Sequence, residues 1–333
     1  MGKEDRKLPR KMNVEIVEKS ICMERRRLSI SKPREEQIPK LRKLWKEAFG
    51  DTDDFLDGFY KTAFDKERCR CVIIDGEVAA ALYWFDCDIK EENVAADTSQ
   101  TDLQAASLEL LQTDLRSAEV SGDVVSEKRN HRIAYIYAVA TAKKFQGQQI
   151  CHKLMEETHK YLRECGYEGV ILVPGSEELF RFYEGIGYRI CSYIREFQCV
   201  AEPKNISFEQ IDMETYAMLR REYLPKGGVV QEKENLDFLK MQACFYAGED
   251  FVLAARKEGD VLRGIELLGN ENVAAGVVHA LGCKDGDFRR QACQREYLVE
   301  RYDGMQERCV PFGTYYSLTE KSKMPEYFGL AFD

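Results

Sequence analysis

The sequence of 333 residues has only four histidines, and none of its twelve cysteines forms a CxxC pair. Cys69 and Cys71 are separated by only one residue, which is not the CxxC spacing. A structural zinc site needs closely spaced sulfur and nitrogen ligands, and we therefore expect no metal. Cysteines scattered through apolar runs are typical of reduced thiols, which predicts a cytoplasmic protein.

The sequence also lacks an apolar run long enough to cross a bilayer, and we expect no signal peptide. Its formal net charge is −9, whereas a nucleic-acid-binding protein needs a concentrated basic surface. The hydrophobic and charged fractions, 44% and 32%, are ordinary for a globular protein, and the length allows two domains. We therefore expect neither nucleic acid nor a membrane as a partner.

The stretch from Arg132 to Tyr188 predicts a strand, a turn, a helix and a second strand. Ile133 to Ala140 is a short apolar run bounded by polar residues, the pattern of a strand buried on both faces. After the polar turn 141–148, apolar residues recur at helical spacing until Gly166 supplies a stop signal. A second apolar run, 169–173, ends at a proline and is too short for a helix. This order predicts a right-handed βαβ crossover.

The turn that opens the predicted helix has the character of an anion site. Its backbone N–H groups have no partner within the helix, and the helix dipole adds positive potential. Val139 to Cys151 reads VATAKKFQGQQIC, and about thirty residues later Leu179 to Tyr188 reads LFRFYEGIGY. With these two motifs in this order, the chain resembles the GNAT family of acetyl-CoA-dependent N-acetyltransferases, whose pyrophosphate loop is Arg/Gln-x-x-Gly-x-Gly/Ala.

The resemblance implies that acetyl-CoA, as acyl donor, binds the central strand and the loop. The residues at the matching positions are Ala138, Val139, Ala140, Gln146, Gly147, Gln148, Gln149, Ile150 and Cys151. Gln149 and Cys151 stand where the family has small residues, and a glutamine side chain is poorly suited to a positive φ. An N-acetyltransferase acting on a primary amine is thus one hypothesis. The alternatives are a catalytically weak acyl-CoA-binding regulatory protein and a purely structural module.

The resemblance also implies catalytic residues. It places Tyr183 as the proton donor to the departing thiolate, with a packed core aromatic as the alternative. The central strand has no carboxylate, so Asp86 and Asp88 on the preceding strand are candidate bases, unless they are merely solvated strand-end residues. Some multi-domain relatives bring a C-terminal carboxylate into the active site. Asp333 is therefore a further candidate, with an exposed chain end as the alternative.

The remaining elements predict the fold class, an α/β protein of α+β type. A strand, two helices and a hairpin with an Asp-Gly turn precede the βαβ unit, the order of a GNAT fold with a central mixed sheet flanked by helices. We expect a second GNAT-like domain after it. The predicted ranges are a polar extension at 1–24, the GNAT domain at 25–200 with a flexible insertion at about 90–130, and the degenerate second domain at 205–333.

In the second half we expect helices at 209–223, 233–244 and 288–302, with a hairpin at 250–268 and strands at 272–281 and 327–332. The loop Cys283 to Asp287 then falls in the phosphate-binding position, where its two aspartates would repel a pyrophosphate. We therefore expect the first half alone to bind CoA. The remaining expected partners are an amine acceptor and, as an open possibility, a second copy of the chain.

Overall fold

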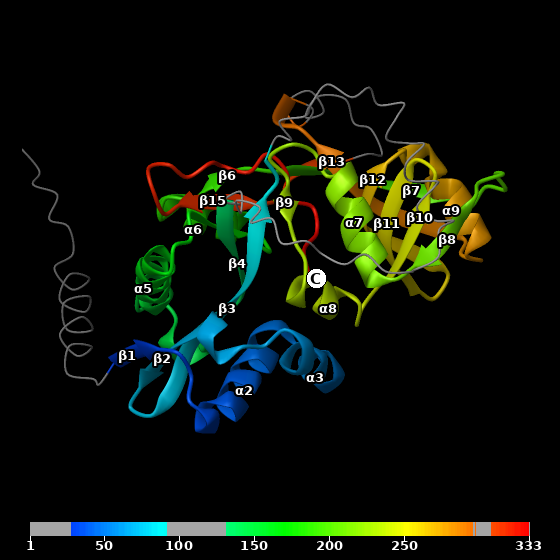
Figure 1. The fold of residues 1–333 in the computed structure, drawn as a ribbon. Coiled ribbons are helices and arrows are strands. Elements are labelled where there is room, and N and C mark those ends of the chain that lie inside the picture. The colour runs from blue at the N-terminus through cyan, green and yellow to red at the C-terminus, as the bar shows by residue number, and fades with distance from the viewer. Residues whose placement is uncertain (1–27, 92–130, 296, 298–307, 333) are drawn as a thin grey trace, which may run out of the picture.

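The computed structural model describes residues 28–91, 131–295, 297 and 308–332, and Figure 1 draws them as two mixed β-sheets with their helices. The expected extension 1–24, most of the insertion at 90–130 and Asp333 lie outside these residues. Within these ranges, every helix is too short or too polar to span a bilayer.

The first sheet contains the predicted βαβ unit. Its strands follow in the order β1 (Leu28–Ser31), β2 (Cys69–Ile74), β3 (Glu77–Ile89), β4 (His131–Thr141), β5 (Gly169–Leu172), β15 (Thr314–Ser317) and β6 (Arg189–Ile190), and β9 (Val229–Val230) pairs with β3. Strand β4 is parallel to β5, as a βαβ unit requires, and the other pairs are antiparallel.

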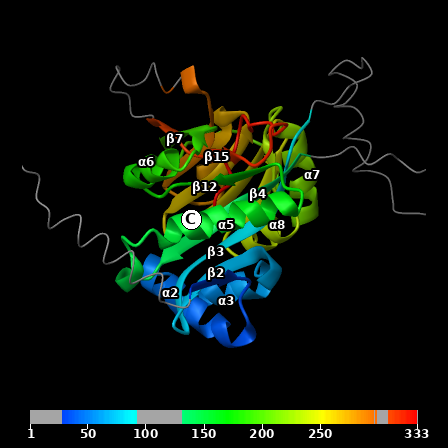
Figure 2. The ribbon, with the colours of Figure 1, turned by 90° about the vertical axis from the view of Figure 1, so that its left-hand side faces the viewer.

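Helices cover both faces of the first sheet. On one face α5 (Ile150–Glu164) packs against β2, β3 and β4, and it crosses the sheet in Figure 2. On the other face lie α2 (Ile38–Phe49) and α3 (Asp53–Thr62). The remaining helical segments are η1 (Glu35–Gln37), η2 (Lys66–Arg68), η3 (Lys143–Phe145) and α6 (Glu177–Gly185).

The boundaries of α2 and α3 have local causes. Gly50 ends α2 in the left-handed region at φ 79°, and the Thr52 side chain accepts a hydrogen bond from Phe55 N at the start of α3. The hairpin turn Asp75-Gly76 has positive φ at both residues, which confirms its prediction from the Asp-Gly pair.

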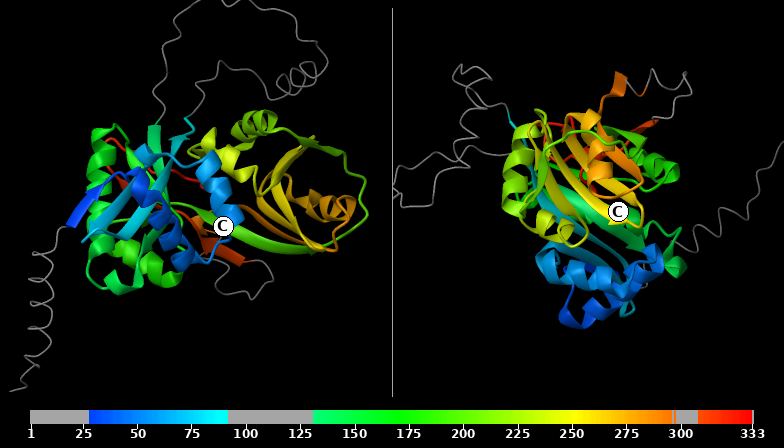
Figure 3. Two further views of the ribbon diagram at one scale, coloured as in Figure 1. Left: turned by 90° about the horizontal axis from the view of Figure 1, so that it is seen from below. Right: turned by 90° about the vertical axis from the view of Figure 1, so that its right-hand side faces the viewer.

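The second sheet has seven strands. Their order is β14 (Arg308–Pro311), β7 (Tyr193–Val200), β13 (Asp285–Ala292), β12 (Val261–Gly269), β11 (Phe251–Glu258), β10 (Cys244–Gly248) and β8 (Phe208–Ile211). Helix α9 (Ala274–Ala280), preceded by η4 (Glu271–Val273), covers one face, shown toward the viewer in the right panel of Figure 3. Helices α7 (Met213–Tyr223) and α8 (Glu234–Leu239) lie on the face toward the first sheet.

The two sheets share one topology and exchange one strand. Read from β1 and from β8, each sheet runs through five strands in chain order, and the fourth and fifth are parallel. The next position is filled from the other part of the chain. Strand β15 lies between β5 and β6, and β7 lies between β13 and β14. The ranges 25–200 and 205–333 stay a prediction about folding units, but each contributes a strand to the other's sheet.

The two exchanged strands begin side by side: Ser192 directly precedes β7, Gly313 directly precedes β15, and the two residues are hydrogen-bonded to each other. The Ser192 hydroxyl accepts a hydrogen bond from Gly313 N at 2.9 Å and donates to the Phe328 carbonyl at 3.1 Å. A Cβ on Gly313 would lie 2.7 Å from the Ser192 oxygen, so only glycine fits there. These hydrogen bonds therefore bring the C-terminal segment into contact with the connection between the two sheets.

Several second-half predictions are wrong. The segment 272–281 is helical (η4 and α9) rather than a strand, and the expected helix at 288–302 begins as strand β13. The expected helix 233–244 ends at Leu239 in α8, and β10 follows. Cys283 to Asp287 is consequently not a phosphate-loop position, because it joins α9 to β13; the corresponding loop is 270–273, between β12 and α9.

The C-terminal segment 327–332 is buried but is not a strand. Its hydrophobic residues are at most 5% exposed, yet its backbone makes only an isolated bridge, from Tyr327 to Gly228. Its carbonyl groups are bound individually, since Val229 N donates to the Tyr327 carbonyl and the Gln231 side chain donates to that of Leu330. The predicted strand at 327–332 is therefore wrong, since the carbonyls of Tyr327, Phe328 and Leu330 are bound one at a time by Val229, Ser192 and Gln231.

Candidate functional site

Strands β4 and β5 separate after a short stretch of pairing. Their parallel register runs from Ile133–Gly169 to Tyr135–Ile171, and β5 ends at Leu172 while β4 continues to Thr141. Residues 136–141 of β4 therefore have β3 as a neighbour on one edge and no β5 partner on the other. This edge leaves backbone polar groups available to a ligand between the strands.

A β-bulge lies at this open edge. The β3–β4 register shifts between the pairs Ala81–Ala140 and Tyr83–Tyr137, so Ala138 and Val139 face a single residue of β3. Ala138 has a φ of 50°, in the left-handed region, and both residues are partly exposed. Bulges of this kind redirect backbone groups. Here the N–H groups of 138–140 can meet the carbonyl oxygen of a thioester and stabilise charge that develops on it.

The loop after β4 forms the second part of the site. Gly147 and Gln149 both have positive φ, 71° and 59°, and Gln149 is the residue that precedes the first turn of α5. The side chains of Gln146 and Gln148 donate to the carbonyls of Thr141 and Lys144, both at 3.0 Å. These side chains hold the loop, and α5 is 15 residues long, so its N-terminal N–H groups and dipole favour an anion.

Gln149 and Cys151, the two departures from the family pattern, take different roles. Gln149 occupies the left-handed region expected from the motif, which costs a non-glycine residue about 1–2 kcal/mol. Burial raises the pKa of the Cys151 thiol to about 11, so it stays protonated near neutral pH and cannot act as a thiolate nucleophile.

Tyr183 lies on α6 beside the start of α5. Its ring is buried and packs on Tyr188, with ring centroids 5.4 Å apart. Burial raises the pKa of the Tyr183 phenol well above its ordinary value, and the nearby Cys151 adds to the shift. Its hydroxyl makes no hydrogen bond to another residue in the described part of the chain and is not completely buried. A neutral phenol facing the cofactor loop can donate a proton.

Asp86 is held in an ion cluster. It accepts hydrogen bonds from the Tyr167 hydroxyl and, at 3.1 Å, from Arg132. Arg68 lies 3.6 Å from its other oxygen and 2.5 Å from Glu234. Asp88 also has an interaction partner. Both candidate bases therefore have partners in the structure, and both carboxylate oxygens of Asp86 face a partner within the cluster.

A cluster of aromatic side chains, which we call the aromatic wall, packs on the face of β4 that carries Tyr135 and Tyr137. Tyr135 and Tyr137 are two residues apart on β4 and so lie on one face of it, where they pack against Phe332 with ring centroids 5.6 and 5.8 Å apart. Phe85 and Phe238 complete this wall. The sequence signal for Phe332 was only the apolar character of the C-terminal run, and Phe238 had none. The C-terminal segment thus ends beside the strand that carries the bulge.

The corresponding place in the second sheet is built differently. Pairing of β12 with β13 continues through a register shift to Leu267–Arg290, so these strands do not separate as β4 and β5 do. The loop residue Glu271 forms an ion pair with Arg290, and α9 has only seven residues. A carboxylate at this position opposes a pyrophosphate. This geometry favours the first sheet as the location of a CoA site.

Comparisons with known proteins identify the domain around the first site. Residues 87–201 match the family model described as the acetyltransferase (GNAT) domain. No curated protein is similar in sequence. Among solved structures, a probable N-acyltransferase of unknown function from Enterococcus faecalis V583 has a TM-score of 0.60 at 14% identity, covering 87% of this chain and 73% of that one.

Two further structures share the fold. The GCN5-related N-acetyltransferase from Kribbella flavida has a TM-score of 0.58 at 14% identity, over 87% of this chain and 71% of its own. Eis1 from Mycobacterium abscessus has a TM-score of 0.55 at 9% identity, over 87% and 73%. At such identities the likeness concerns the fold. Together with the family model, it shows that the chain carries a GNAT acetyltransferase domain within a fold of GNAT type.

Proposed function

We propose that the protein is an N-acetyltransferase that moves an acetyl group from acetyl-CoA to a primary amine of a small molecule or peptide. The observation that carries this proposal is the open edge of β4, with its bulge at Ala138, directly followed by the left-handed loop at Gly147. One surface thereby offers N–H groups both to a thioester carbonyl and to a pyrophosphate.

The residues divide the chemistry as follows. Loop amides from Gln146 to Cys151 bind the phosphates, and the amides of 138–140 polarise the thioester carbonyl. The amine, with an ordinary pKa of about 10.4, must lose a proton before it attacks. In this proposal Tyr183 protonates the departing thiolate. Cysteines in the described ranges are free thiols, which supports the cytoplasm as the proposed location.

Calorimetric titration with acetyl-CoA, followed by thiol release across polyamines, amino acids, aminoglycosides and peptides, tests the proposal. Binding with acetyl transfer to an amine supports an enzyme. Binding without turnover on any acceptor would favour the second candidate, a regulatory acyl-CoA-binding protein, for which the strained Gln149 is the specific observation. A protein that fails to bind acetyl-CoA contradicts both.

The first test variant is Gly147→Asp, which should abolish acetyl-CoA binding. Gly147 has a φ of 71° and open space at its Cβ position, so the added carboxylate would face the loop that binds phosphates. Repulsion between this carboxylate and the pyrophosphate removes the affinity. Calorimetry on the folded variant measures the effect.

Gly166→Asp is the matched control at the opposite end of α5. Gly166 also has a positive φ, 83°, and an open Cβ position, so it introduces similar backbone strain and the same charge. We expect it to lower stability while acetyl-CoA still binds. Unchanged affinity in Gly147→Asp, or two CoA molecules bound per chain, would refute the assignment of the loop.

A second proposal concerns Asp333, whose carboxylates we propose to relay the amine proton. Phe332, which precedes Asp333 in the sequence, contacts Tyr137, the residue before the bulge. Adding a few glycine and serine residues after Asp333 displaces the terminal charge. Asp333→Asn removes the side-chain charge. We expect at least one of these two variants, the extended chain or Asp333→Asn, to have a kcat lower by at least about tenfold, measured by thiol release. Full kcat in both variants contradicts the relay.

A further inference from the structure

Trp45 packs against the β-bulge from the side of α2. It lies near the C-terminal end of this helix and is 2% exposed. Its ring centroid is 5.1 Å from that of Tyr83 on β3 and 5.6 Å from that of Tyr137 on β4. These two tyrosines are paired across the strands, and the next pair, Ala81–Ala140, lies beyond the register shift. Trp45 thus contacts both strands at the pair that closes the bulge.

The indole of Trp45 is fixed by Asp51. Gly50 ends α2 in the left-handed region, and the chain then turns back so that Asp51 meets the helix it follows. Trp45 Nε1 donates to Asp51 Oδ2 at 2.7 Å. Because an indole has a single donor and a buried one needs a partner, this hydrogen bond sets the orientation of the ring.

The bulge needs a support because its backbone is strained. Ala138 has a φ of 50°, and a residue other than glycine keeps such a conformation only where the surrounding structure enforces it. Tyr137 directly precedes Ala138, so a fixed Tyr137 ring fixes the chain where it enters the bulge. On the β3 side, the Tyr83 and Tyr60 hydroxyls form a hydrogen bond of 3.1 Å, which ties the same pair to α3.

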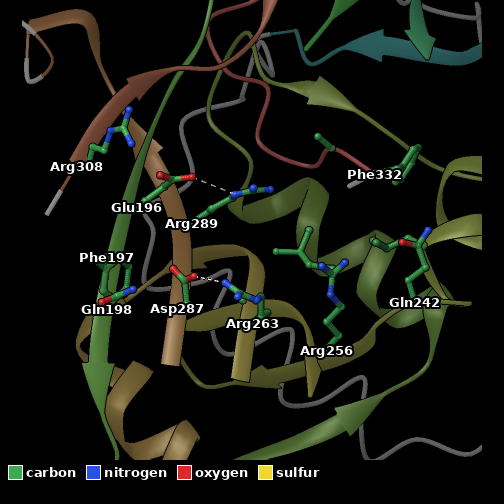
Figure 4. A pocket seen from close by; sticks show the side chains of 14 residues that line it. Glu196, Phe197, Gln198, Gln242, Arg256, Arg263, Asp287, Arg289, Arg308 and Phe332 are labelled. Carbon is green, nitrogen blue, oxygen red and sulfur yellow. Dashed lines mark hydrogen bonds and ion pairs between the residues drawn. The ribbon is translucent and has the colours of Figure 1, made fainter. Parts of the chain in front are cut away.

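Two other rings at this pair are less well suited to orient it. Phe59 on α3 contacts Tyr83 and Tyr137 at 5.2 and 6.2 Å, but a phenylalanine has no polar atom that could fix its ring. Phe332 packs on Tyr137 and also lines a cavity of about 390 Å³, shown in Figure 4, so it has open space beside it. Of these three rings, Trp45 alone combines contact with both strands and a hydrogen bond.

We propose that Trp45 and Asp51 are positioning residues for acetyl transfer. Asp51 orients the indole, and the indole holds the Tyr83–Tyr137 pair so that the bulge presents its N–H groups to the thioester carbonyl. The inference rests on the proposed function, because it assigns what keeps this polarising edge in place. Negative charge on the carbonyl oxygen grows in the transition state, so a displaced bulge lowers kcat more than it lowers affinity.

Asp51→Leu and Asp51→Asn are the decisive pair of variants. Both new side chains are close to aspartate in size, and Asp51 is only partly buried, so we expect the fold to be kept. Leucine leaves the indole N–H without an acceptor, whereas asparagine retains a carbonyl oxygen for it. We expect Asp51→Leu to lower kcat about 10- to 100-fold. Its affinity for CoA, which has no thioester carbonyl, should be unchanged in calorimetry.

Asp51→Asn should keep most of the kcat of the unaltered protein, because the hydrogen bond to the indole is retained. Asp54→Leu is the matched control, since it removes an exposed carboxylate in the first turn of α3 and leaves the Trp45–Asp51 bond in place. Trp45→Phe keeps a ring and loses the donor, so it should lower kcat as Asp51→Leu does. It also decides the question if Asp51→Leu fails to fold.

The conformation of the bulge can be measured without turnover. Labelling with ¹³C at the tyrosine carbonyl carbon and ¹⁵N on alanine selects, by NMR, the amides of alanines that follow a tyrosine. The sequence has three, Ala138, Ala217 and Ala247, and the last two lie on α7 and β10, away from the bulge. Ala217→Ser and Ala247→Ser assign their signals by removing them. We expect Asp51→Leu to shift the Ala138 signal alone, and Asp51→Asn to shift none.

The inference is overturned if the Ala138 signal, or kcat, is the same in Asp51→Leu as in the unaltered protein. It is also overturned if Asp51→Asn behaves like Asp51→Leu, since the charge of Asp51 would then act instead of its hydrogen bond to Trp45. If the unaltered protein binds acetyl-CoA but acetylates no amine, the proposed function fails. The Ala138 signal then decides by itself whether Asp51 and Trp45 hold the bulge.

Discussion

Glu266→Gln should lower the free energy of unfolding by about 3–5 kcal/mol, the usual cost of removing one partner of a buried ion pair. Glu266 and Arg220 are 1% and 2% exposed and form two hydrogen bonds, at 2.6 and 3.0 Å. The substitution leaves the Arg220 guanidinium charged, buried and without its counter-ion. Urea unfolding followed by circular dichroism measures the change.

The neighbouring residues of α7 provide a matched control. Arg221 forms an ion pair with Glu232 at 2.7 Å, but both side chains are substantially exposed. Glu232→Gln should therefore cost less than about 1 kcal/mol, as exposed pairs do. If Glu266→Gln destabilised the protein no more than Glu232→Gln, the buried pair would not be the stabilising interaction that its geometry indicates.

The same pair also holds the C-terminal segment. The Tyr327 hydroxyl donates to Glu266 at 3.0 Å, and five residues later Phe332 packs against Tyr135 and Tyr137. The buried cluster thus couples strand β12 of the second sheet to the aromatic wall beside β4. Loss of Glu266 is expected to free the segment as well as to weaken the core, so stability and acceptor binding should change together.

Local signals explain which elements the sequence could predict. Helix stops at Gly50 and Gly166 and the turn Asp75-Gly76 depend on backbone conformations that glycine adopts easily, so each is specified within a few residues. The βαβ unit was readable for a related reason: a short apolar run, a polar turn and a helical period follow one another without interruption.

Tertiary contacts explain what the sequence could not show. The run 272–281 is mostly apolar, which fits a buried strand and a buried helix equally well. In the structure it forms a helix whose apolar side chains pack into the core of the second sheet. Residues 285–292 became a strand because β7 and β12 pair with both of its edges. The sequence also could not predict the exchange of β7 and β15. Alternation of apolar and polar residues predicts that a segment is a strand but not which strand it pairs with.

The candidate site shows the same division. Gly147 and Tyr183 could be found from motifs on contiguous segments. The bulge at Ala138 could not, because it exists only in the register between β3 and β4. Phe238 on α8 and Phe332 in the C-terminal segment are far from β4 in the sequence, and only tertiary packing brings their rings against Tyr137.

Tyr183→Phe should lower kcat about 10²–10⁴-fold, the usual contribution of a general acid, while acetyl-CoA affinity hardly changes. Burial raises the pKa of the Tyr183 phenol above its ordinary value, so the group stays protonated up to pH 10. Its titration should therefore cause no loss of activity below that pH. Steady-state thiol release from pH 6 to about pH 10 and calorimetry with acetyl-CoA measure the two effects.

Tyr188→Phe separates catalysis from packing. Tyr188 lies in the same aromatic cluster, but its hydroxyl bonds His159 at 2.7 Å within the core. Removing that hydroxyl should reduce stability by about 1 kcal/mol and leave kcat unaltered, because the group does not reach the cofactor loop. If Tyr183→Phe behaved in the same way, Tyr183 would be a core aromatic, and the thiolate would have to take its proton from water.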